Sequence, residues 1–252
     1  MEIIILGSGT CAVTRRRSCS SYYIRTSEQH ILLDIGFGAL RRMSEAGIDY
    51  REIDVVLCSH FHLDHIGDLA PLLMALRFTP GYERKKPLTL IGPQGFRDFL
   101  HASQELYGDW LLPRDEYPLT IYELNTEHLE VNGCVIRAMT MHHTPYTNGY
   151  RLEHQGKAVA YSADTGPCDE LVELCKDADL AFVECSFPND QPFEFHLTPQ
   201  QAADAAQRAK VKHLILTHFY PMMDDFDVKA SCRHLFEGRL DVAEDLARYT
   251  LS

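Results

Sequence analysis

Short apolar runs that are rich in β-branched residues alternate along the chain with segments of helical period. The apolar runs predict strands at 2–6, 21–25, 30–33, 55–58, 88–91, 119–124, 134–141, 149–153, 158–162, 180–184, 213–217 and 239–243. The helical period predicts helices at 40–46, 69–78, 95–107, 169–177, 199–210 and 226–235. Hairpins and crossover connections occur together, which predicts an α/β protein with mixed sheets.

The length and the even distribution of these elements indicate one domain over residues 1–252. No repeat, low-complexity tract or flexible linker divides the 252 residues, and a chain of this size buries roughly 70 to 75% of its unfolded surface. The longest apolar runs fall far short of the roughly 20 residues that cross a bilayer. The arginines at 15–17 follow the first apolar run, the reverse of a secretory signal, so we expect a cytoplasmic protein without a membrane partner.

Charge and cysteine content narrow the classes of function. The 24 basic and 36 acidic side chains give a net charge of −12, which disfavours general binding to polyphosphates because that binding depends on Lys and Arg. Two local basic clusters, Arg15–Arg17 and Arg84–Lys86, could contact RNA or be ordinary solvated loops. The eight cysteines form no CxxC pair, and we expect reduced thiols.

The segment that carries chemistry is SHFHLDHIGD at residues 59–68. With 13 histidines in 252 residues, the pattern HxHxDH is expected by chance about 0.003 times. His60 and His62 lie two apart where a strand ends, so they project to the same side, whereas Asp64 and His65 lie where the next helix begins. Three imidazoles and a carboxylate suit zinc. The alternative is a polar loop with surface histidines.

Further potential ligands follow other predicted strands. His142 and His143 follow the strand at 134–141, Asp164 follows 158–162, and His218 follows 213–217. A single His or Asp in such a place is usually an ordinary loop residue. Because the placement recurs, we expect these side chains to converge on one rim.

The chain resembles the metallo-β-lactamase-fold hydrolases, and within them the ribonuclease Z-like branch. The likeness is carried by HFHLDHIGD (60–68), LGSGT (6–10) with Arg17 and Ser21, LLDIG (32–36), IGPQG (91–95), HTPYTNGYR (143–151), YSADTG (161–166), FVECSF (182–187), FHLT (195–198), LTHF (216–219) and AEDL (243–246). It implies a four-layer αββα sandwich of two mixed sheets flanked by helices, α/β in class or α+β by some schemes, with a dinuclear metal site at one sheet edge.

The resemblance also implies which residues hold two Zn²⁺ ions per chain. His60, His62 and His143 would hold one zinc, Asp64, His65 and His218 the other, and Asp164 would bridge them. His143 is chosen over His142 because the family's histidine stands six residues before the glycine of GYR, here Gly149. His142 stays an alternative, and Mn²⁺ or Fe could replace zinc on the same ligands.

The catalytic residues that the resemblance implies are Asp64, His196 and Glu184. Two metals about 3.5–4 Å apart lower the pKa of a shared water and suit phosphodiester hydrolysis. His196 would protonate the leaving group, and Glu184 would orient that imidazole. Asp34 would hold residues 59–68, which we call the metal loop, by hydrogen bonds. Alternatively, Asp34 could simply form a turn before Gly36.

The chain departs from the transfer-RNA-processing members of this branch, which carry an arm between the third histidine motif and the bridging aspartate. Asp164 follows His143 by only 21 positions, and one hairpin uses this whole interval. We therefore expect a phosphodiesterase acting on a small phosphodiester, a cyclic nucleotide or a short RNA. The alternatives are a ribonuclease Z-type tRNA 3′-end endonuclease, a lactone or thioester hydrolase, a redox di-iron protein, and a catalytically silent binding protein. The oligomeric state is open, with a homodimer as one option.

Aromatic side chains flank the motifs. They could line a substrate pocket or pack in the interior, and they are Phe61, Tyr146, Phe187, Phe219 and Tyr220.

Overall fold

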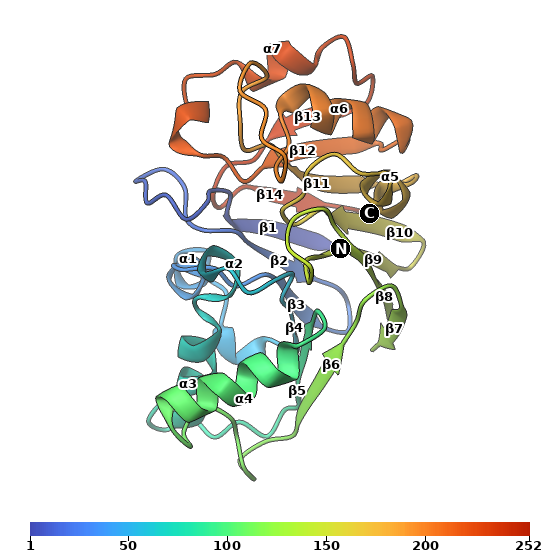
Figure 1. Ribbon diagram of the computed structural model, residues 1–252. Coiled ribbons are helices and arrows are strands. Elements are labelled where there is room, and N and C mark those ends of the chain that lie inside the picture. Colours follow the sequence, from blue (N-terminus) through green and yellow to red (C-terminus); the bar gives the residue numbers. More distant parts are fainter.

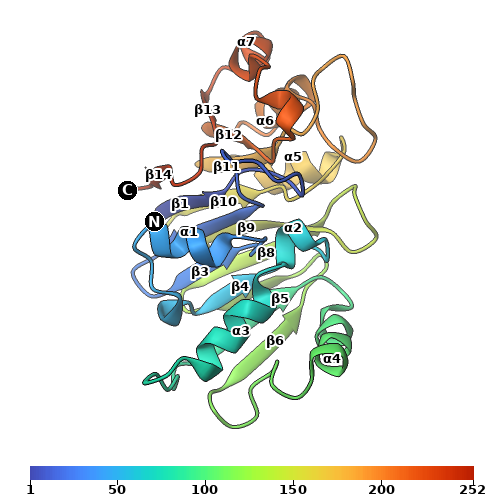
Figure 2. The same cartoon turned by 90° about the vertical axis from the view of Figure 1, so that its left-hand side faces the viewer.

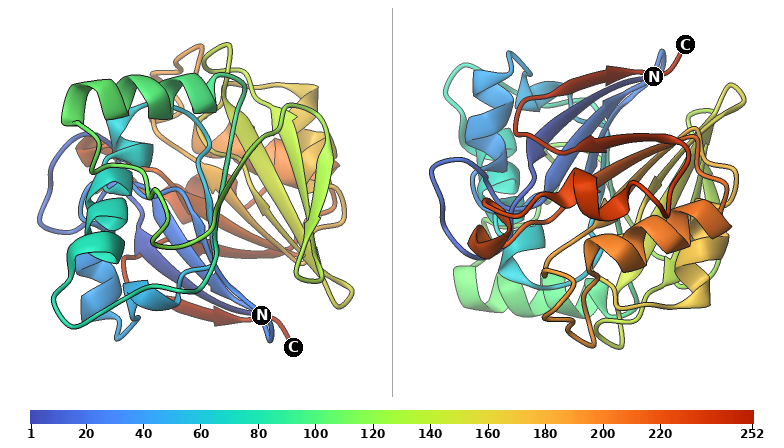
Figure 3. Two further views of the ribbon diagram at one scale, coloured as in Figure 1. Left: turned by 90° about the horizontal axis from the view of Figure 1, so that it is seen from below. Right: turned by 90° about the horizontal axis from the view of Figure 1, so that it is seen from above.

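Two seven-stranded β-sheets form the centre of the protein in the computed structural model, which describes residues 1–252 (Figure 1). The first sheet has the order β14-β1-β2-β3-β4-β5-β6, and the second has the order β13-β12-β11-β10-β9-β8-β7. Helices cover the outer face of each sheet, as Figures 2 and 3 show from other sides. The predicted αββα sandwich is therefore confirmed.

The first half of the chain builds the first sheet and the second half builds the second sheet, except that the last strand, β14, belongs to the first sheet. The first-half elements are β1 (Glu2–Gly7), β2 (Ser21–Arg25), β3 (His30–Leu33), α1 (Ala39–Glu45), η1 (Tyr50–Glu52), β4 (Val55–Leu57), α2 (Leu63–Ile66), α3 (Leu69–Phe78), β5 (Leu88–Gly92), α4 (Phe96–Tyr107) and β6 (Leu119–Glu123). The others are β7 (His128–Val131), β8 (Cys134–Thr140), β9 (Asn148–His154), β10 (Lys157–Tyr161), α5 (Asp169–Cys175), β11 (Leu180–Glu184), α6 (Pro199–Arg208), β12 (His213–Thr217), η2 (Pro221–Met223), α7 (Val228–Cys232), β13 (Arg239–Val242) and β14 (Arg248–Thr250).

Both faces of the central strands are buried, which explains their continuous apolar runs. In β1, Ile3 and Ile5 belong to the larger core, which includes residues of both sheets. Ile4 and Leu6 belong to a second core with residues of α3 and α4. Successive side chains of a strand point to opposite faces of the sheet, so alternate residues of this one apolar run pack into two different cores.

The elements missed from sequence are short and lie at sheet edges or inside loops. β7 and β14 are edge strands whose side chains are half-buried or exposed, so they lack the apolar pattern of the inner strands. The helix predicted at 226–235 is confined to α7. The predicted hairpin between β9 and β10 is present, with Gln155 and Gly156 at φ 50° and 74° in its turn.

One edge of the sandwich collects the loops that follow parallel strands. β3 and β4 are parallel in the first sheet, and β10, β11 and β12 are parallel in the second. Three non-glycine residues just past these strands have positive φ: Asp34 (56°), Ala163 (53°) and His218 (60°). Such backbone strain is typical of functional sites. No helix of the structure combines the length and the apolar character that crossing a membrane requires.

Candidate metal centre

The residues singled out as metal ligands come together at this edge in two adjoining groups. His60 lies in the loop after β4, and His62 caps the short helix α2, which carries Asp64 and His65. The remaining residues, His143, Asp164 and His218, follow β8, β10 and β12. The convergence expected from their repeated placement at strand ends is therefore present in the fold.

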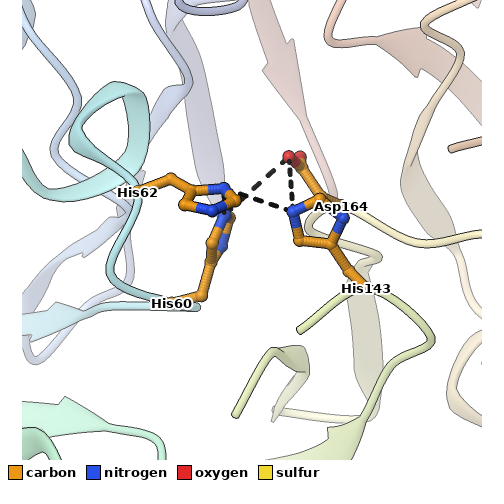
Figure 4. Close-up of side chains that lie close together, drawn as sticks. All are labelled: His60, His62, His143 and Asp164. Carbon is orange, nitrogen blue, oxygen red and sulfur yellow. Dashed lines mark hydrogen bonds and ion pairs between the residues drawn. The ribbon is translucent and has the colours of Figure 1, made fainter. Parts of the chain in front are cut away.

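The first group consists of three imidazole nitrogens and one carboxylate oxygen (Figure 4). His60 Nε2 lies 3.0 Å from His62 Nδ1, which lies 3.2 Å from His143 Nε2. Asp164 Oδ2 lies 3.8 Å from His60 Nε2 and 3.6 Å from His143 Nε2. Four ligand atoms at zinc–ligand distances around a tetrahedron stand roughly 3.3 Å apart, so this group has the dimensions of a metal site.

The second group is formed by Asp64, His65 and His218. His65 Nε2 lies 3.2 Å from His218 Nε2 and 3.8 Å from Asp64 Oδ2. His218 Nε2 lies 3.6 Å from the same Asp64 oxygen. These three atoms therefore also fit a divalent metal.

Asp164 stands between the two groups and presents a different oxygen to each. Oδ2 faces the first group, whereas Oδ1 lies 3.2 Å from His65 Nε2 and 3.3 Å from His218 Nε2. Oδ1 is buried and accepts no hydrogen bond. A buried polar atom without a partner is costly unless something else satisfies it, and a cation between these imidazoles would do so.

Four of the five clustered histidines are held through the ring nitrogen that points away from the centre. His65 Nδ1 donates to Asp34 Oδ2 over 2.7 Å, and His143 Nδ1 donates to the Phe195 carbonyl oxygen over 3.2 Å. His60 Nδ1 lies 3.0 Å from Ser59 Oγ, and His218 Nδ1 lies 3.0 Å from Ser186 Oγ. Such outer contacts fix the tautomer that leaves the inner nitrogen free to bind a metal.

Asp34 is the hub of a buried network under the metal loop. Its Oδ1 accepts from the Ser59 main-chain N–H over 2.7 Å, and its Oδ2 accepts from Ser59 Oγ over 2.7 Å and from Tyr161 Oη over 2.6 Å. Asp34 also accepts a hydrogen bond from His65. Its carboxylate therefore holds His65 directly and holds Ser59, the residue before His60. The supporting role expected for Asp34 fits these contacts. Ser59 and Tyr161 were missed from sequence because a lone Ser or Tyr beside a motif carries no signal.

Burial and neighbouring charges set the ionisation of the cluster. Burial lowers the pKa of His60 well below its ordinary value, and the neighbouring His65 lowers it further. Burial raises the pKa of Asp64, but the hydrogen bond to His218 and the charges of His65 and His218 together outweigh this and bring the pKa to about 2. Burial likewise raises the pKa of Asp164, yet His218 and His65 hold it well below its usual range. Ionised carboxylates and a neutral His60 are the forms in which these groups bind metals. Burial lowers the pKa of His65, but Asp164 and Asp34 raise it well above its ordinary value, so His65 would lose a proton when a metal binds.

A histidine–glutamate pair lies beside the two groups. His196 Nδ1 lies 2.7 Å from Glu184 Oε1, and both side chains are buried. The Glu184 oxygens also accept from the Thr165 and Leu197 N–H groups and from Ser186 Oγ. Because these donors occupy the carboxylate, we interpret Glu184 as the partner of His196 rather than as a metal ligand.

The cavity at the centre is open to solvent and has a volume of about 680 Å³. The ligands His62, Asp64, His143 and Asp164 line it, together with His196. Of the five aromatic residues noted in the sequence, only Tyr220 lines it; Phe61 stacks on Phe99 at 5.0 Å, and Phe219 is buried against Arg17. The apolar lining residues Val13, Phe37 and Leu63 were missed. Val13 and Phe37 lie between motifs, Leu63 lies within the histidine motif, and an apolar side chain carries no chemical signature in either place.

His142 lies outside both groups. Its side chain is exposed, and its ring meets Phe195 edge-on at 5.5 Å. His143 is the member of the pair whose imidazole reaches the cluster. All eight cysteines have free thiols.

The chain has extensive similarity to known proteins. The family described as "Beta-lactamase superfamily domain" matches residues 29–219. A ribonuclease Z of Mycobacterium bovis (strain BCG / Pasteur 1173P2) is 29% identical over 272 residues, covering 98% of this chain and 97% of the relative. The metallo-beta-lactamase fold protein YhfI from Bacillus subtilis superposes with a TM-score of 0.86 at 20% identity, over 98% of both chains. The short form of human tRNase Z superposes with a TM-score of 0.81 at 22% identity, over 100% of both chains.

Proposed function

The chain belongs to the β-lactamase superfamily as a ribonuclease Z-like metallohydrolase, and on that premise we propose that it is a dinuclear zinc-dependent phosphodiesterase acting on a small phosphodiester. The observation that carries the proposal is the position of Asp164, whose two carboxylate oxygens face two separate groups of ligand atoms. In this proposal His60, His62 and His143 hold one ion, and Asp64, His65 and His218 hold the other.

Two bound divalent ions would lower the pKa of a shared water toward neutrality and offset the charge of a docked phosphate. The chain's own residues supply the proton transfer. His196 Nδ1 is held by Glu184 over 2.7 Å, so the opposite nitrogen, Nε2, is the atom that would give a proton to the leaving oxygen. Asp64 would act in this scheme as a ligand of the second ion.

A small substrate is favoured because the two basic clusters of the sequence are engaged within the protein. Arg17 and Arg84 are buried, and both guanidinium groups donate to main-chain carbonyl oxygens. Arg16, Lys85 and Lys86 pair with acidic neighbours. Arg15 and Arg84 form no ion pair, but Arg84 is buried and donates to main-chain carbonyl oxygens, so Arg15 is the one cation of the six that is free at the surface. Electrostatic binding to an RNA backbone requires many free cations.

The chain segment between His143 and Asp164 adds a second argument for a small substrate. Its residues form the turn before β9, the strands β9 and β10, and the tight turn joining them. An RNA-gripping arm at this point of the chain has no residues from which to form. Without such an arm, bound metals would supply the positive charge that attracts the phosphate.

The first candidate to weigh against this proposal is a ribonuclease Z-type endonuclease, which the name of the M. bovis relative suggests. The second is hydrolysis of a lactone or thioester at the same metals. A thioester would have less need of the His196–Glu184 pair, because a thiolate leaves more easily than an alkoxide. A catalytically silent binding protein is disfavoured because the ligand set is complete.

The deciding experiment compares three substrate classes on the zinc-reconstituted protein: bis(p-nitrophenyl) phosphate, a homoserine lactone and a precursor tRNA. We expect hydrolysis of the phosphodiester, with little or no cleavage of the other two. Lactone hydrolysis without phosphodiester hydrolysis would overturn the proposal, and specific 3′ cleavage of the precursor tRNA would replace the small substrate with RNA. Inactivity toward all three would favour the silent binding protein.

A further inference from the structure

The cavity beside the metal centre is lined in part by apolar side chains. Val13, Phe37 and Leu63 are among its lining residues, and we name these three side chains the apolar wall. They come from three separate segments: the loop after β1, the loop after β3, and the first residue of α2. No Lys or Arg is among the lining residues.

The apolar wall is exposed to an unusual degree. Val13 is 96% exposed, Leu63 is 61% exposed and Phe37 is 50% exposed. Single exposed apolar residues need no explanation, but three that gather from distant segments around a polar centre mark a binding surface. A substrate group that covers them would gain the free energy of apolar burial.

Phe37 is built into its position rather than projecting freely from a loop. It stands between Gly36 and Gly38, and a Cβ at Gly36 would come within 2.0 Å of the Asp64 carbonyl oxygen. Its ring lies against Gly67 in the metal loop, where a Cβ would come within 2.8 Å of two ring carbons. The backbone is tied down as well, because the Ile35 N–H donates to the His65 carbonyl oxygen over 2.8 Å. The ring therefore keeps a fixed place relative to the metal loop.

We infer that the substrate carries an uncharged, flat aromatic group next to the scissile phosphate, and that this group is bound against the apolar wall. The inference rests on the proposed function and specifies its substrate class. The cavity of about 680 Å³ has the size of a nucleotide-scale ligand site. A fixed aromatic ring favours a flat partner, since offset or edge-on ring contacts add to the gain from buried area. Because no Lys or Arg lines the cavity, additional phosphate groups on the substrate would meet no cationic side chain there.

Two sources could supply such a group: an aryl ester, or the base of a nucleotide. Binding to the zinc-loaded protein, measured by calorimetry, separates them with phenylphosphonate, thymidine 5′-monophosphate and methylphosphonate as probes. We expect at least one aromatic probe to bind about tenfold more tightly than methylphosphonate. The tighter of the two aromatic probes identifies the source.

The variants Phe37→Ala and Leu63→Ala should each weaken the preferred aromatic probe about 3- to 10-fold and leave methylphosphonate unchanged. Phe37→Tyr should restore binding because it keeps the ring. The matched control is Phe78→Ala, which removes a phenylalanine on α3 that is also 50% exposed but does not line the cavity. Phe37 and Leu63 are each at least 50% exposed, so truncating either side chain leaves the hydrophobic core intact.

Equal affinity for all three probes, or an equal loss for all three in Phe37→Ala, would overturn the inference. The binding measurement does not depend on turnover. A protein that binds the aromatic probe through the wall but hydrolyses no phosphodiester would therefore contradict the proposed reaction and support the wall as a binding surface. A protein that hydrolyses phosphodiesters but binds the aromatic probes no more tightly than methylphosphonate would support the proposed reaction and contradict the wall as a binding surface.

Discussion

The carboxylate of Asp34 accepts a hydrogen bond from His65 Nδ1 over 2.7 Å, although the two residues lie 31 positions apart and both are fully buried. Asp34 leaves β3 with a positive φ of 56°, and His65 lies in α2. This contact joins the first sheet to the metal loop and fixes the tautomer of one ligand.

The Asp34→Asn variant should bind zinc about 10- to 100-fold more weakly, because it loses the charge that holds His65. Competition with a chromophoric chelator measures the affinity. Asp54→Asn is the matched control, since Asp54 makes a similar main-chain contact, to His30, away from the centre. Equal affinities for the wild type and Asp34→Asn would refute the supporting role.

Asp164 and His143 should differ in how many metals their loss removes. Asp164→Ala removes one carboxylate oxygen from each of the two ligand groups, so we expect it to disturb both sites. His143→Ala takes one nitrogen from the first group only and should leave the second site occupied. Metal content after gel filtration distinguishes the two. Loss of both metals in His143→Ala, or of one in Asp164→Ala, would contradict the bridging role.

The pH dependence of turnover should report the Glu184–His196 pair. Burial lowers the pKa of His196, but the hydrogen bond and charge of Glu184 outweigh it, so the pKa lies above its ordinary value of about 6.5. A proton donor works in its protonated form, so kcat should be level below this pKa and fall as pH rises through it. In Glu184→Gln burial acts without the opposing charge, and the falling limb should move to lower pH.

A second glutamate–histidine pair provides the control for that profile. Glu28 Oε2 lies 3.0 Å from His154 Nε2, away from the centre. Glu28→Gln should leave the pH profile unchanged. With a phosphodiester whose leaving group is an alkoxide, an unchanged falling limb in Glu184→Gln, or turnover by His196→Ala within about tenfold of the wild type, would remove His196 from the proton-transfer role.

Metal removal should destabilise the fold, since the cluster gathers ionised carboxylates and a buried oxygen without a partner. At a free zinc concentration 100 times the dissociation constant, each site adds about 2.7 kcal/mol to the free energy of unfolding. Two sites together should raise Tm by about 10 °C or more for a chain of this length. Calorimetric scans with zinc and with EDTA test this, and coincident scans would argue against structured metal sites.

The family, the sandwich and the clustering of the seven residues proposed as ligands could be predicted because they leave strong marks on the sequence. HxHxDH is improbable by chance, and inner strands such as β1 and β11 contain unbroken apolar runs (3–6 and 180–183) because both of their faces are buried. The choice of His143 over His142 depended on its spacing to Gly149, and its ring does reach the cluster.

The supporting network and the apolar wall could not be predicted, for a physical reason. Tyr161 reaches Asp34 from a strand 127 positions away, and Phe37 meets the metal loop only because Gly67 leaves room for its ring. Contacts between distant segments depend on how the two sheets pack, which no local pattern encodes. The edge strands β7 and β14 were missed for the related reason that exposed strands have no apolar period.

The most direct test of a dinuclear phosphodiesterase is a titration of the metal-free protein with zinc while hydrolysis of bis(p-nitrophenyl) phosphate is followed. The account predicts that the rate rises until two equivalents of zinc per chain have been added and is level thereafter. A plateau at one equivalent, or no hydrolysis at any zinc concentration, would contradict it.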